Sequence, residues 1–339
     1  MLRVGLIGLG GIGRHHLMRY RQAPEAQVVA VADVRAGDLR ADADLAALLE
    51  APAEDVRWFD DYQDLVTSGA VDAVDICLPT YLHRPAAVAA LEAGLHTLVE
   101  KPMALTLEDC DAMLAAAEAA GRVLMVAHCI RFWPEYQYLA DLVRSGDAGR
   151  LLSLQMSRQG QRPSGASAGW MGQASRSGGA IYDLHIHDID YCQYLLGLPQ
   201  RLYAQGGMSL GAEAGYDYVL GNLDYGDDRQ VSATAHWVSV GLPFAARFEA
   251  RLEGAFLRFD SSQHPALTVY RAEGDPEHPA LPGPDAYVNE IRYFAQRALD
   301  GRAPERCRAR STRNSVALVI GEMASLDRGG LVDVAEWTV

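Results

Sequence analysis

The first 130 residues alternate short apolar runs with stretches of helical length and pattern. The apolar runs predict strands at residues 3–8, 27–33, 71–78, 97–100 and 123–128, and the stretches between them predict helices at residues 13–23, 39–51, 84–93 and 107–120. Several strands, such as QVVAVAD at 27–33, are apolar on both faces, so helices must cover both sides of their sheet. The alternation therefore predicts a doubly wound α/β domain with a parallel sheet.

The pattern changes after about Phe132. We expect a helix at 135–145, a strand at 151–157, a Gly/Ser-rich loop at 160–179, a helix at 181–196, strands at 202–207, 218–225, 230–240, 245–253, 256–260 and 267–271, helices at 286–299 and 312–327, and a short terminal strand. Consecutive strands joined by short turns predict an open, mostly antiparallel sheet, which makes the second part an α/β domain of another kind. The long loop ahead of a polar helix suits a lid.

Length and composition predict two globular domains. The chain has 339 residues, whereas about 150 residues per domain is usual. Its 49% apolar and 22% charged residues are typical of a globular protein. We place the boundary where the pattern changes, giving domains at residues 1–127 and 128–339, and we allow the last helix and strand to pack back on the first domain.

Charge and cysteine content disfavour several classes of protein. A formal net charge of -14 repels phosphate groups, which argues against nucleic acids and anionic membrane surfaces as partners. The five cysteines are scattered without a CxxC pair, which argues against disulfides or a structural zinc site and fits a reducing cytoplasm. No apolar stretch is long enough to span a bilayer, and the glycine-rich start does not fit a signal peptide. We therefore expect a cytoplasmic protein.

A glycine-rich segment follows the first predicted strand. Residues 8–13, Gly-Leu-Gly-Gly-Ile-Gly, match G-x-G-x-x-G and precede a predicted helix, as in dinucleotide-binding Rossmann domains. The first glycine permits a tight turn, the second lets the backbone approach a pyrophosphate, and the third lets helix and strand pack closely. We expect the cofactor to contact Gly8, Gly10, Gly11, Ile12 and Gly13.

An acidic residue follows at the spacing that this motif requires. Asp33 comes at the end of the second predicted strand, 20 residues after Gly13, where a carboxylate can accept hydrogen bonds from a ribose 2′-OH. An acid there repels a 2′-phosphate, so NAD is favoured over NADP. Arg35 keeps NADP possible, because an arginine near this position can accommodate the phosphate.

Lys101 is the one lysine among the 30 basic residues, and it follows the strand predicted at 97–100. It therefore lies at the carboxyl edge of the sheet, where open α/β sheets bind ligands. Pro102 disfavours helical geometry at Lys101 and holds its side chain near the strand end. Unlike arginine, a partly desolvated lysine can both donate a hydrogen bond and exchange a proton. We interpret Lys101 as a functional residue at the cofactor crevice.

The second candidate group is Asp183 and His187 in the helix predicted at 181–196. Residues four apart share a helix face, so the carboxylate can orient the imidazole and raise its basicity, as in a general base. A plain helix-stabilising pair is the alternative. Metal ligation by His185 and His187 with Asp183 and Asp190 is disfavoured, because a helix spreads these side chains over too wide an arc. The pair His15-His16 fits a helix surface or a cofactor neighbour better than a metal site.

Taken together, these motifs resemble the Gfo/Idh/MocA oxidoreductases, which include inositol and glucose-type dehydrogenases. The resemblance runs along nearly the whole chain and rests on GLIGLGGIG at 5–13, Asp33, Pro79-Thr80-x-x-His83, Glu100-Lys101-Pro102, Arg131-Phe132-x-Pro134, and Ser177-Gly178-Gly179 leading to Asp183-x-x-x-His187. It implies an N-terminal Rossmann domain and a C-terminal domain whose open sheet often forms the interface of a dimer or tetramer.

The resemblance also implies roles for individual residues. Lys101, Asp183 and His187 look like a catalytic trio, and Gly8, Gly10, Gly13, Asp33, Pro79, Thr80, His83 and Glu100 look like cofactor contacts. Trp170 resembles the family's tryptophan in the lid loop. Met171 and His185 depart from the family pattern, which concerns the shape of the substrate pocket more than the reaction.

The sequence thus predicts hydride transfer between NAD and a secondary alcohol of a sugar, inositol or related polyol. His187, oriented by Asp183, would take the hydroxyl proton while Lys101 hydrogen-bonds the same oxygen. Three alternatives stay open: a dehydrogenase of another carbonyl class such as a dihydrodiol or imine, a non-catalytic NAD-binding regulator, and a metal-dependent hydrolase that uses His185 and His187.

Overall fold

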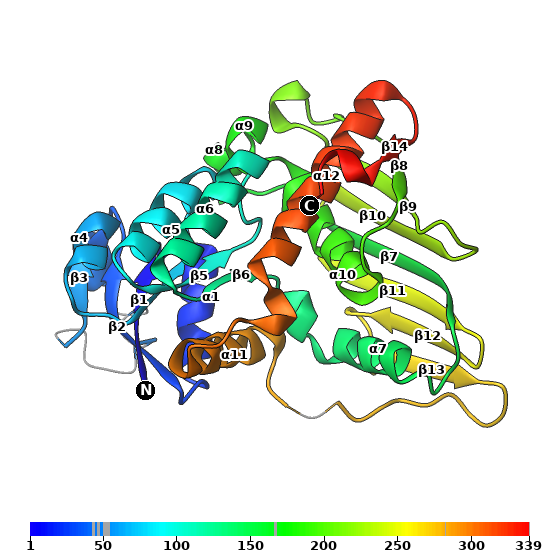
Figure 1. The fold of residues 1–339 in the computed structure, drawn as a ribbon, viewed down its shortest axis with the longest axis horizontal. Helices are drawn as coiled ribbons and strands as arrows, with labels where there is room; N and C mark the ends of the chain where they lie inside the picture. The colour runs from blue at the N-terminus through cyan, green and yellow to red at the C-terminus, as the bar shows by residue number, and fades with distance from the viewer. Residues whose placement is uncertain (43–44, 46–47, 50–54, 166–167, 282, 339) are drawn as a thin grey trace. The chain divides into compact units, whose positions relative to one another are not determined.

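The computed structural model describes residues 1–42, 45, 48–49, 55–165, 168–281 and 283–338 (Figure 1). The chain divides into two units. The first comprises Met1–Phe132 and Pro284–Arg313, and the second comprises Trp133–Gly283 and Asn314–Val339. Among the described residues, no helix combines the length and apolarity that a bilayer span needs.

Six parallel strands form the sheet of the first unit. They are β1 (Leu2–Ile7), β2 (Ala26–Ala32), β3 (Arg57–Phe59), β4 (Ala73–Ile76), β5 (His96–Glu100) and β6 (Leu124–Ala127). Their order in space is β3-β2-β1-β4-β5-β6, so the direction of strand progression reverses between β1 and β4. This sheet confirms the predicted doubly wound fold, in which ligands bind outside the carboxyl ends of the strands near such a reversal.

Helices cover both faces of this sheet (Figure 1). One face carries α4 (Tyr62–Thr67), α5 (His83–Glu92) and α6 (Leu107–Ala120), and the other carries α1 (Gly11–Tyr20) and α11 (Ala286–Asp300). The ends of α6 match the prediction because local capping sets them: the Thr106 hydroxyl accepts a hydrogen bond from the Asp109 N–H, and Gly121 takes the left-handed conformation. The short α2 (Ala36–Arg40) precedes a region in which most of the helix predicted at 39–51 lies outside the described residues.

The assignment of the late part of the chain to the two units differs from our expectation. Residues 284–313, which we placed in the second domain, belong to the first unit, where the apolar side of α11 packs near α1 and Arg292 forms an ion pair with Glu25. The terminal strand β14 (Val332–Asp333) pairs with β8 of the second sheet and belongs to the second unit. An amphipathic pattern indicates that a helix needs a partner surface, but not which one.

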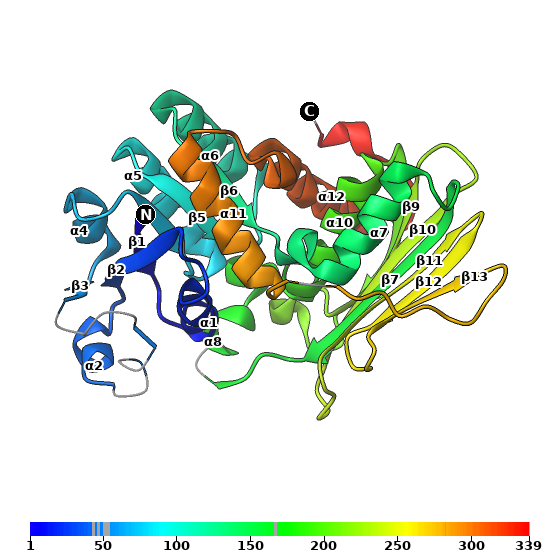
Figure 2. The ribbon, with the colours of Figure 1, turned by 90° about the horizontal axis from the view of Figure 1, so that it is seen from below.

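An eight-stranded sheet forms the second unit. Its strands are β7 (Leu151–Gln161), β8 (Arg201–Gly207), β9 (Tyr218–Asp224), β10 (Gln230–Val238), β11 (Ala245–Leu252), β12 (Ala255–Asp260), β13 (Leu267–Arg271) and β14. The order is β13-β12-β11-β7-β10-β9-β8-β14, and the pairs are antiparallel except for β7 with β10. The helices α7 (Pro134–Ser145), α10 (Ile186–Leu196) and α12 (Ala309–Arg328) lie on one face of this sheet (Figure 2). Buried residues alternate with partly exposed ones along β10, as expected for a sheet with one covered face.

Two local departures from the prediction lie ahead of α10. The segment expected as one loop at 160–179 contains the end of β7 and the short helices α8 (Ala168–Met171) and α9 (Ala174–Ser177). The helix expected over 181–196 begins as a π-helical turn, η4 (Ile181–His185), and becomes α-helical at Ile186. Isolated π-turns are rare and occur frequently at functional sites.

Candidate cofactor and active-site residues

The glycine-rich turn between β1 and α1 has room for a ligand at its tip and none at its base. Gly8 has a φ of +92°, and a Cβ on Gly13 would lie 1.9 Å from the carbonyl oxygen of Gly8. In contrast, no heavy atom lies within 4 Å of the Cβ position of Gly10 or Gly11. No side chain caps the N-terminus of α1. Its N–H groups can therefore face an anion, which is what a dinucleotide pyrophosphate requires.

Asp33 lies at the end of β2 and holds the glycine turn from the side. Its Oδ2 accepts a hydrogen bond from the Leu9 N–H at 2.8 Å, and its Oδ1 accepts one from the Arg35 N–H at 2.9 Å. The Arg35 guanidinium, half exposed, lies 3.3 Å from Oδ1. Two carboxylate oxygens offer about four acceptor positions. Three of them accept hydrogen bonds within the protein, and the one that remains can accept a hydrogen bond from a ribose hydroxyl.

The segment after β4 is fixed from within the protein. Pro79 precedes the 3₁₀ turn η1 (Thr80–Leu82), in which Thr80 is buried. His83, also buried, lies between two carbonyl oxygens, with Nδ1 2.8 Å from Pro102 and Nε2 2.9 Å from Leu78. Burial lowers the pKa of His83. The ring therefore links the end of β4 to the segment after β5.

Glu100 and Lys101 lie at the carboxyl end of β5. The Glu100 Oε2 accepts a hydrogen bond from the Lys101 N–H at 3.0 Å, and the Lys101–Pro102 peptide is cis. Burial alone would raise the pKa of Glu100, but contact with His16 and the charge of Lys101 outweigh burial and hold that pKa below its ordinary value. Glu100 is therefore an anion beside the Lys101 ammonium.

The strand order gathers the predicted cofactor residues along one edge. Strands β2, β1, β4 and β5 are neighbours in the sheet, and their carboxyl ends carry Asp33, the glycine turn, Pro79 with Thr80, and Glu100 with Lys101 in that sequence. Because these strands are parallel, their carboxyl ends meet at the same edge. The first unit thus brings together all the residues for which we expect cofactor contacts.

The second unit holds Asp183 and His187. Asp183 lies within the π-turn η4, and its Oδ2 accepts a hydrogen bond from the Trp237 indole N–H on β10 at 3.3 Å. His187 lies in the first turn of α10 and is 8% exposed. Because η4 is not α-helical, our premise of a regular helix from residue 181 is wrong for its first five residues. The pairing of Asp183 with His187 stays a prediction.

Buried charged pairs surround the start of α10. His185 Nε2 lies 3.0 Å from Glu322 Oε1 of α12, with both side chains fully buried. The Arg158 guanidinium of β7 donates to Asp188 Oδ1 at 2.9 Å. Asp190 accepts a hydrogen bond from the Ser315 hydroxyl at 2.6 Å. These contacts with β7 and α12 hold the first turns of α10 in place.

A buried polar cluster in the first unit escaped the sequence analysis. His16, which we expected on a helix surface or beside the cofactor, is fully buried and contacts Asp75 and Glu100. Among the described residues, the potential metal ligands that lie within 4.8 Å of one another are on His16, Asp75 and Cys77 and not on the His185 and His187 set. One signal was present in the sequence, since Asp75 interrupts an otherwise apolar strand.

Comparison with known families matches both units. Residues 2–128 match the model of an oxidoreductase family with an NAD-binding Rossmann fold. Residues 136–255 match the model of the GFO/IDH/MocA C-terminal domain. Residues 2–128 therefore form an NAD-binding domain, and the open glycine turn and Asp33 fit that cofactor.

Several characterised proteins are similar in sequence. The chain is 28% identical to the 2,7-anhydro-N-acetylneuraminate hydratase of Mediterraneibacter gnavus, over 68% of this chain and 62% of that protein. It is 28% identical to the myo-inositol 2-dehydrogenase of Thermotoga maritima, over 63% and 61% of the two chains. It is 31% identical to the levoglucosan dehydrogenase of Pseudarthrobacter phenanthrenivorans, over 67% and 63%. The matches thus span less than two thirds of the length of these relatives.

A solved structure supports the fold over almost the full chain. A levoglucosan dehydrogenase in complex with NADH and levoglucosan superposes with a TM-score of 0.84 at 22% identity, covering 98% of this chain and 99% of that one. The two domain matches agree with this architecture and with the motifs at the carboxyl edge of the first sheet. The chain belongs to the GFO/IDH/MocA family of oxidoreductases.

Proposed function

We propose that the protein is a dehydrogenase that uses NAD to oxidise a secondary alcohol of a sugar, an inositol or a related polyol. The observation that carries the proposal is Lys101, the one lysine of the chain, at the carboxyl end of β5 on the edge that also holds the glycine turn. Relatives named as myo-inositol and levoglucosan dehydrogenases support this substrate class.

The edge of the first sheet holds the cofactor in this proposal. The N-terminus of α1 and the open positions at Gly10 and Gly11 receive the pyrophosphate, and Asp33 accepts a hydrogen bond from the ribose. The remaining contacts come from Gly8, Ile12, Gly13, Arg35, Pro79, Thr80, His83, Glu100 and Lys101. When bound, the nicotinamide ring exchanges the hydride with the alcohol carbon.

The chain's own residues handle the proton. His187 takes the hydroxyl proton as general base, and Asp183 orients its imidazole and stabilises the charge that it acquires. Lys101 donates a hydrogen bond to the same oxygen and stabilises negative charge that develops there. The Trp237 N–H, which donates to Asp183, fixes the direction of that carboxylate.

We also propose that the protein works in the cytoplasm as a homo-oligomer, a dimer or tetramer formed through the eight-stranded sheet. Its five cysteines, all within the described residues, are buried and form no disulfide with one another, which fits a reducing compartment. The sheet carries α7, α10 and α12 on one face, and the partly exposed side chains of β10 lie on the other.

Hydration of an anhydro sugar is a second candidate, favoured by the match to a 2,7-anhydro-N-acetylneuraminate hydratase. A hydration adds water and leaves the redox state of the nicotinamide unchanged overall. Product analysis therefore separates it from a net oxidation.

Absorbance of reduced nicotinamide tests the proposal. Purified protein is mixed with NAD or NADP and a panel of inositols, sugars, sugar acids and anhydro sugars. We expect reduction of NAD by at least one polyol or sugar of the panel. Conversion of an anhydro sugar without net reduction would favour the hydratase, and absence of any conversion across the panel would contradict both candidates.

Replacing Asp33 with asparagine should lower kcat/KM with NAD by roughly 10- to 100-fold, because a hydrogen bond to a charged group contributes about 1.5–3 kcal/mol. Activity with NADP should change less, since the repulsion of its 2′-phosphate is also removed. Steady-state kinetics with both cofactors measure the ratio. Asp38→Asn, the same change on the exposed helix α2, is the control. An unchanged cofactor ratio in Asp33→Asn would remove Asp33 from the ribose site.

Replacing Trp237 with phenylalanine should lower kcat by about 2- to 10-fold, the effect of losing one hydrogen bond of about 0.5–1.5 kcal/mol. The variant keeps an aromatic ring in β10 but loses the N–H that donates to Asp183. NADH affinity should stay the same, as measured by fluorescence titration. Wild-type kcat in Trp237→Phe would show that this contact does not orient Asp183.

A further inference from the structure

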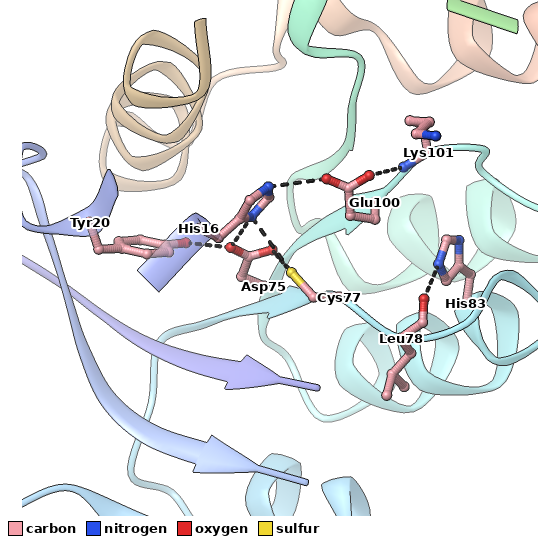
Figure 3. Close-up of polar contacts among 8 residues, drawn as sticks. All are labelled: His16, Tyr20, Asp75, Cys77, Leu78, His83, Glu100 and Lys101. Atoms are coloured by element: carbon pink, nitrogen blue, oxygen red, sulfur yellow. Dashed lines mark hydrogen bonds and ion pairs between the residues drawn. The ribbon is translucent and has the colours of Figure 1, made fainter. Parts of the chain in front are cut away.

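Buried polar side chains from α1, β4 and β5 meet below the carboxyl edge of the first sheet (Figure 3). The His16 imidazole lies between two carboxylates, with Nδ1 2.9 Å from Asp75 Oδ2 and Nε2 3.1 Å from Glu100 Oε1. The side chains of His16 and Asp75 are 0% exposed, and that of Glu100 is 7% exposed. The Tyr20 hydroxyl donates to Asp75 Oδ2 at 3.0 Å from the far side.

The cluster ends at Lys101. Glu100 contacts His16 through Oε1, and its Oε2 accepts the backbone N–H of Lys101 (Figure 3). Its carboxylate is thus held at both oxygens, so its orientation fixes the backbone from which the Lys101 side chain starts. Along this path the charges alternate from Asp75 to His16 to Glu100 to Lys101. Each charge is stabilised by its neighbours, which offsets the cost of burying them.

The surroundings of His16 favour its protonated form. Burial lowers the pKa of His16, but the negative charge of Asp75 and its hydrogen bond with the ring act in the opposite direction and raise that pKa above its ordinary value of 6.5. Several groups face this ring or act on its partners. They are Tyr20 and His15 of α1, Asp75 of β4, Cys77 directly after β4, Glu100 of β5, and Tyr287 and Glu290 of α11. A protonated imidazole carries an N–H on both nitrogens, so Nδ1 donates to Asp75 while the positive charge at Nε2 forms an ion pair with Glu100.

A bound metal ion fits this cluster less well than the imidazolium does. A metal would need a neutral imidazole and a Cys77 thiolate. Burial raises the pKa of the Cys77 thiol, so the thiol keeps its proton. The positive charge that the two carboxylates require therefore comes from His16.

We propose that His16 is a positioning residue for Lys101. By holding Glu100, it sets the backbone position of Lys101 and balances the charge beside it, and it ties the helix of the cofactor turn to the active-site lysine. The effect on catalysis rests on the proposed dehydrogenase function, whereas the protonated state of His16 can be measured without turnover.

Two substitutions at His16 test which contact matters. In His16→Gln the amide nitrogen can reach the place of Nε2 and keep a donor for Glu100, whereas in His16→Asn it can replace only Nδ1 towards Asp75. Misplacing a reacting group by about 1 Å can cost about 100-fold in rate. We expect kcat to fall about 10-fold in His16→Gln and about 100-fold in His16→Asn. KM should stay nearly constant, and the pH profile of kcat should shift in both variants.

Tyr20→Phe is the matched control, because it removes a buried hydrogen bond at the other end of the same cluster without touching Glu100. It should lose thermal stability but keep the kcat and pH profile of the wild type. Equal kcat losses and unshifted pH profiles in all three variants would mean that the cluster only stabilises the fold, and would overturn the proposal. If a His16 variant fails to bind NADH, its kinetics are set aside. The proposal is then tested by the pH profiles of the wild type and Tyr20→Phe together with the direct measurement below.

The direct measurement is the ¹⁵N spectrum of the histidine side chains in the wild-type protein, with the His16 signal assigned from its loss in His16→Gln. We expect imidazolium shifts for His16 at pH 8, well above the ordinary titration range. A neutral ring at pH 8 would overturn the proposal even if the enzyme turns over. An imidazolium in a protein without dehydrogenase activity would overturn the proposed function. It would leave intact the inference that a charged His16 holds Glu100 from its position beside Asp75.

Discussion

Replacing Lys101 with arginine is expected to lower kcat by about 10²- to 10³-fold, the range that the loss of one positioned hydrogen-bond donor to a developing oxyanion costs. Arginine keeps the positive charge, but its planar guanidinium is larger and does not lose its proton near neutral pH. Lys101 starts from a backbone that Glu100 holds and lies next to Pro102, so the larger head group cannot place one donor where the ammonium places it. The loss should appear in kcat, measured by the absorbance of reduced nicotinamide.

The affinity for NADH separates a catalytic loss from a failure to fold. Fluorescence titration should give a Kd for Lys101→Arg within a few-fold of the wild type, because the glycine turn and Asp33 are untouched. Arg84→Lys, the reverse exchange at an exposed position of α5, is the matched control and should leave kcat unchanged. If Lys101→Arg turns over at nearly the wild-type rate, charge alone suffices at this position, and the inference from the single lysine is wrong.

The sequence was sufficient to predict the parallel sheet because the residue pattern that predicts each strand and helix lies within that element's own segment. Strands such as β2 are apolar on both faces, and helices such as α6 carry their own capping residues, so each element can be read from its own segment. The short edge strand β3 is not apolar on both faces, and helix α4, although Asp61 caps its start, has only six residues, so neither was predicted. The placement of α11 in the first unit was missed for a related reason, since its partner α1 is far away in sequence.

The candidate cofactor site could be predicted for a similar reason. Each of its residues follows a strand, and parallel strands place their carboxyl ends at one edge. The spacing of Asp33 and the isolated Glu-Lys-Pro segment were therefore enough to bring Asp33, Glu100 and Lys101 to the same edge as the glycine turn. How Lys101, Asp183 and His187 act together remains a prediction.

The polar groups that support these residues could not be predicted. His16, Asp75 and Glu100 lie far apart in sequence and meet only because α1, β4 and β5 pack together. The same holds for His185 with Glu322 and for Trp237 with Asp183. Each of these contacts depends on tertiary packing, and a single sequence shows only that a polar residue stands in an apolar segment. Such a residue is a reason to look for a partner, because a buried charge needs one.

Replacing Gly13 with alanine is expected to destabilise the first unit and weaken NADH binding together. The new methyl group would lie 1.9 Å from the carbonyl oxygen of Gly8, whereas non-bonded carbon contacts are favourable only beyond about 3.5 Å. A backbone carbonyl cannot rotate away as a side chain can, so α1 must move from the turn. Overpacking of this kind costs about 1–3 kcal/mol, which corresponds to a fall in Tm of roughly 2–12 °C for a unit of this size. Thermal unfolding without cofactor measures it.

Gly10→Ala, at the same turn, is expected to weaken NADH binding without lowering the stability of the unit. It adds the same methyl group where no heavy atom lies within 4 Å, and Gly10 has a φ of -70°, which alanine adopts without strain. Its Tm without cofactor should therefore equal that of the wild type. NADH affinity should still fall, because the methyl group occupies the space through which the pyrophosphate approaches the backbone. Equal Tm values for the Gly10 and Gly13 variants would contradict the packing argument, and wild-type affinity in Gly10→Ala would remove the pyrophosphate from the tip of the turn.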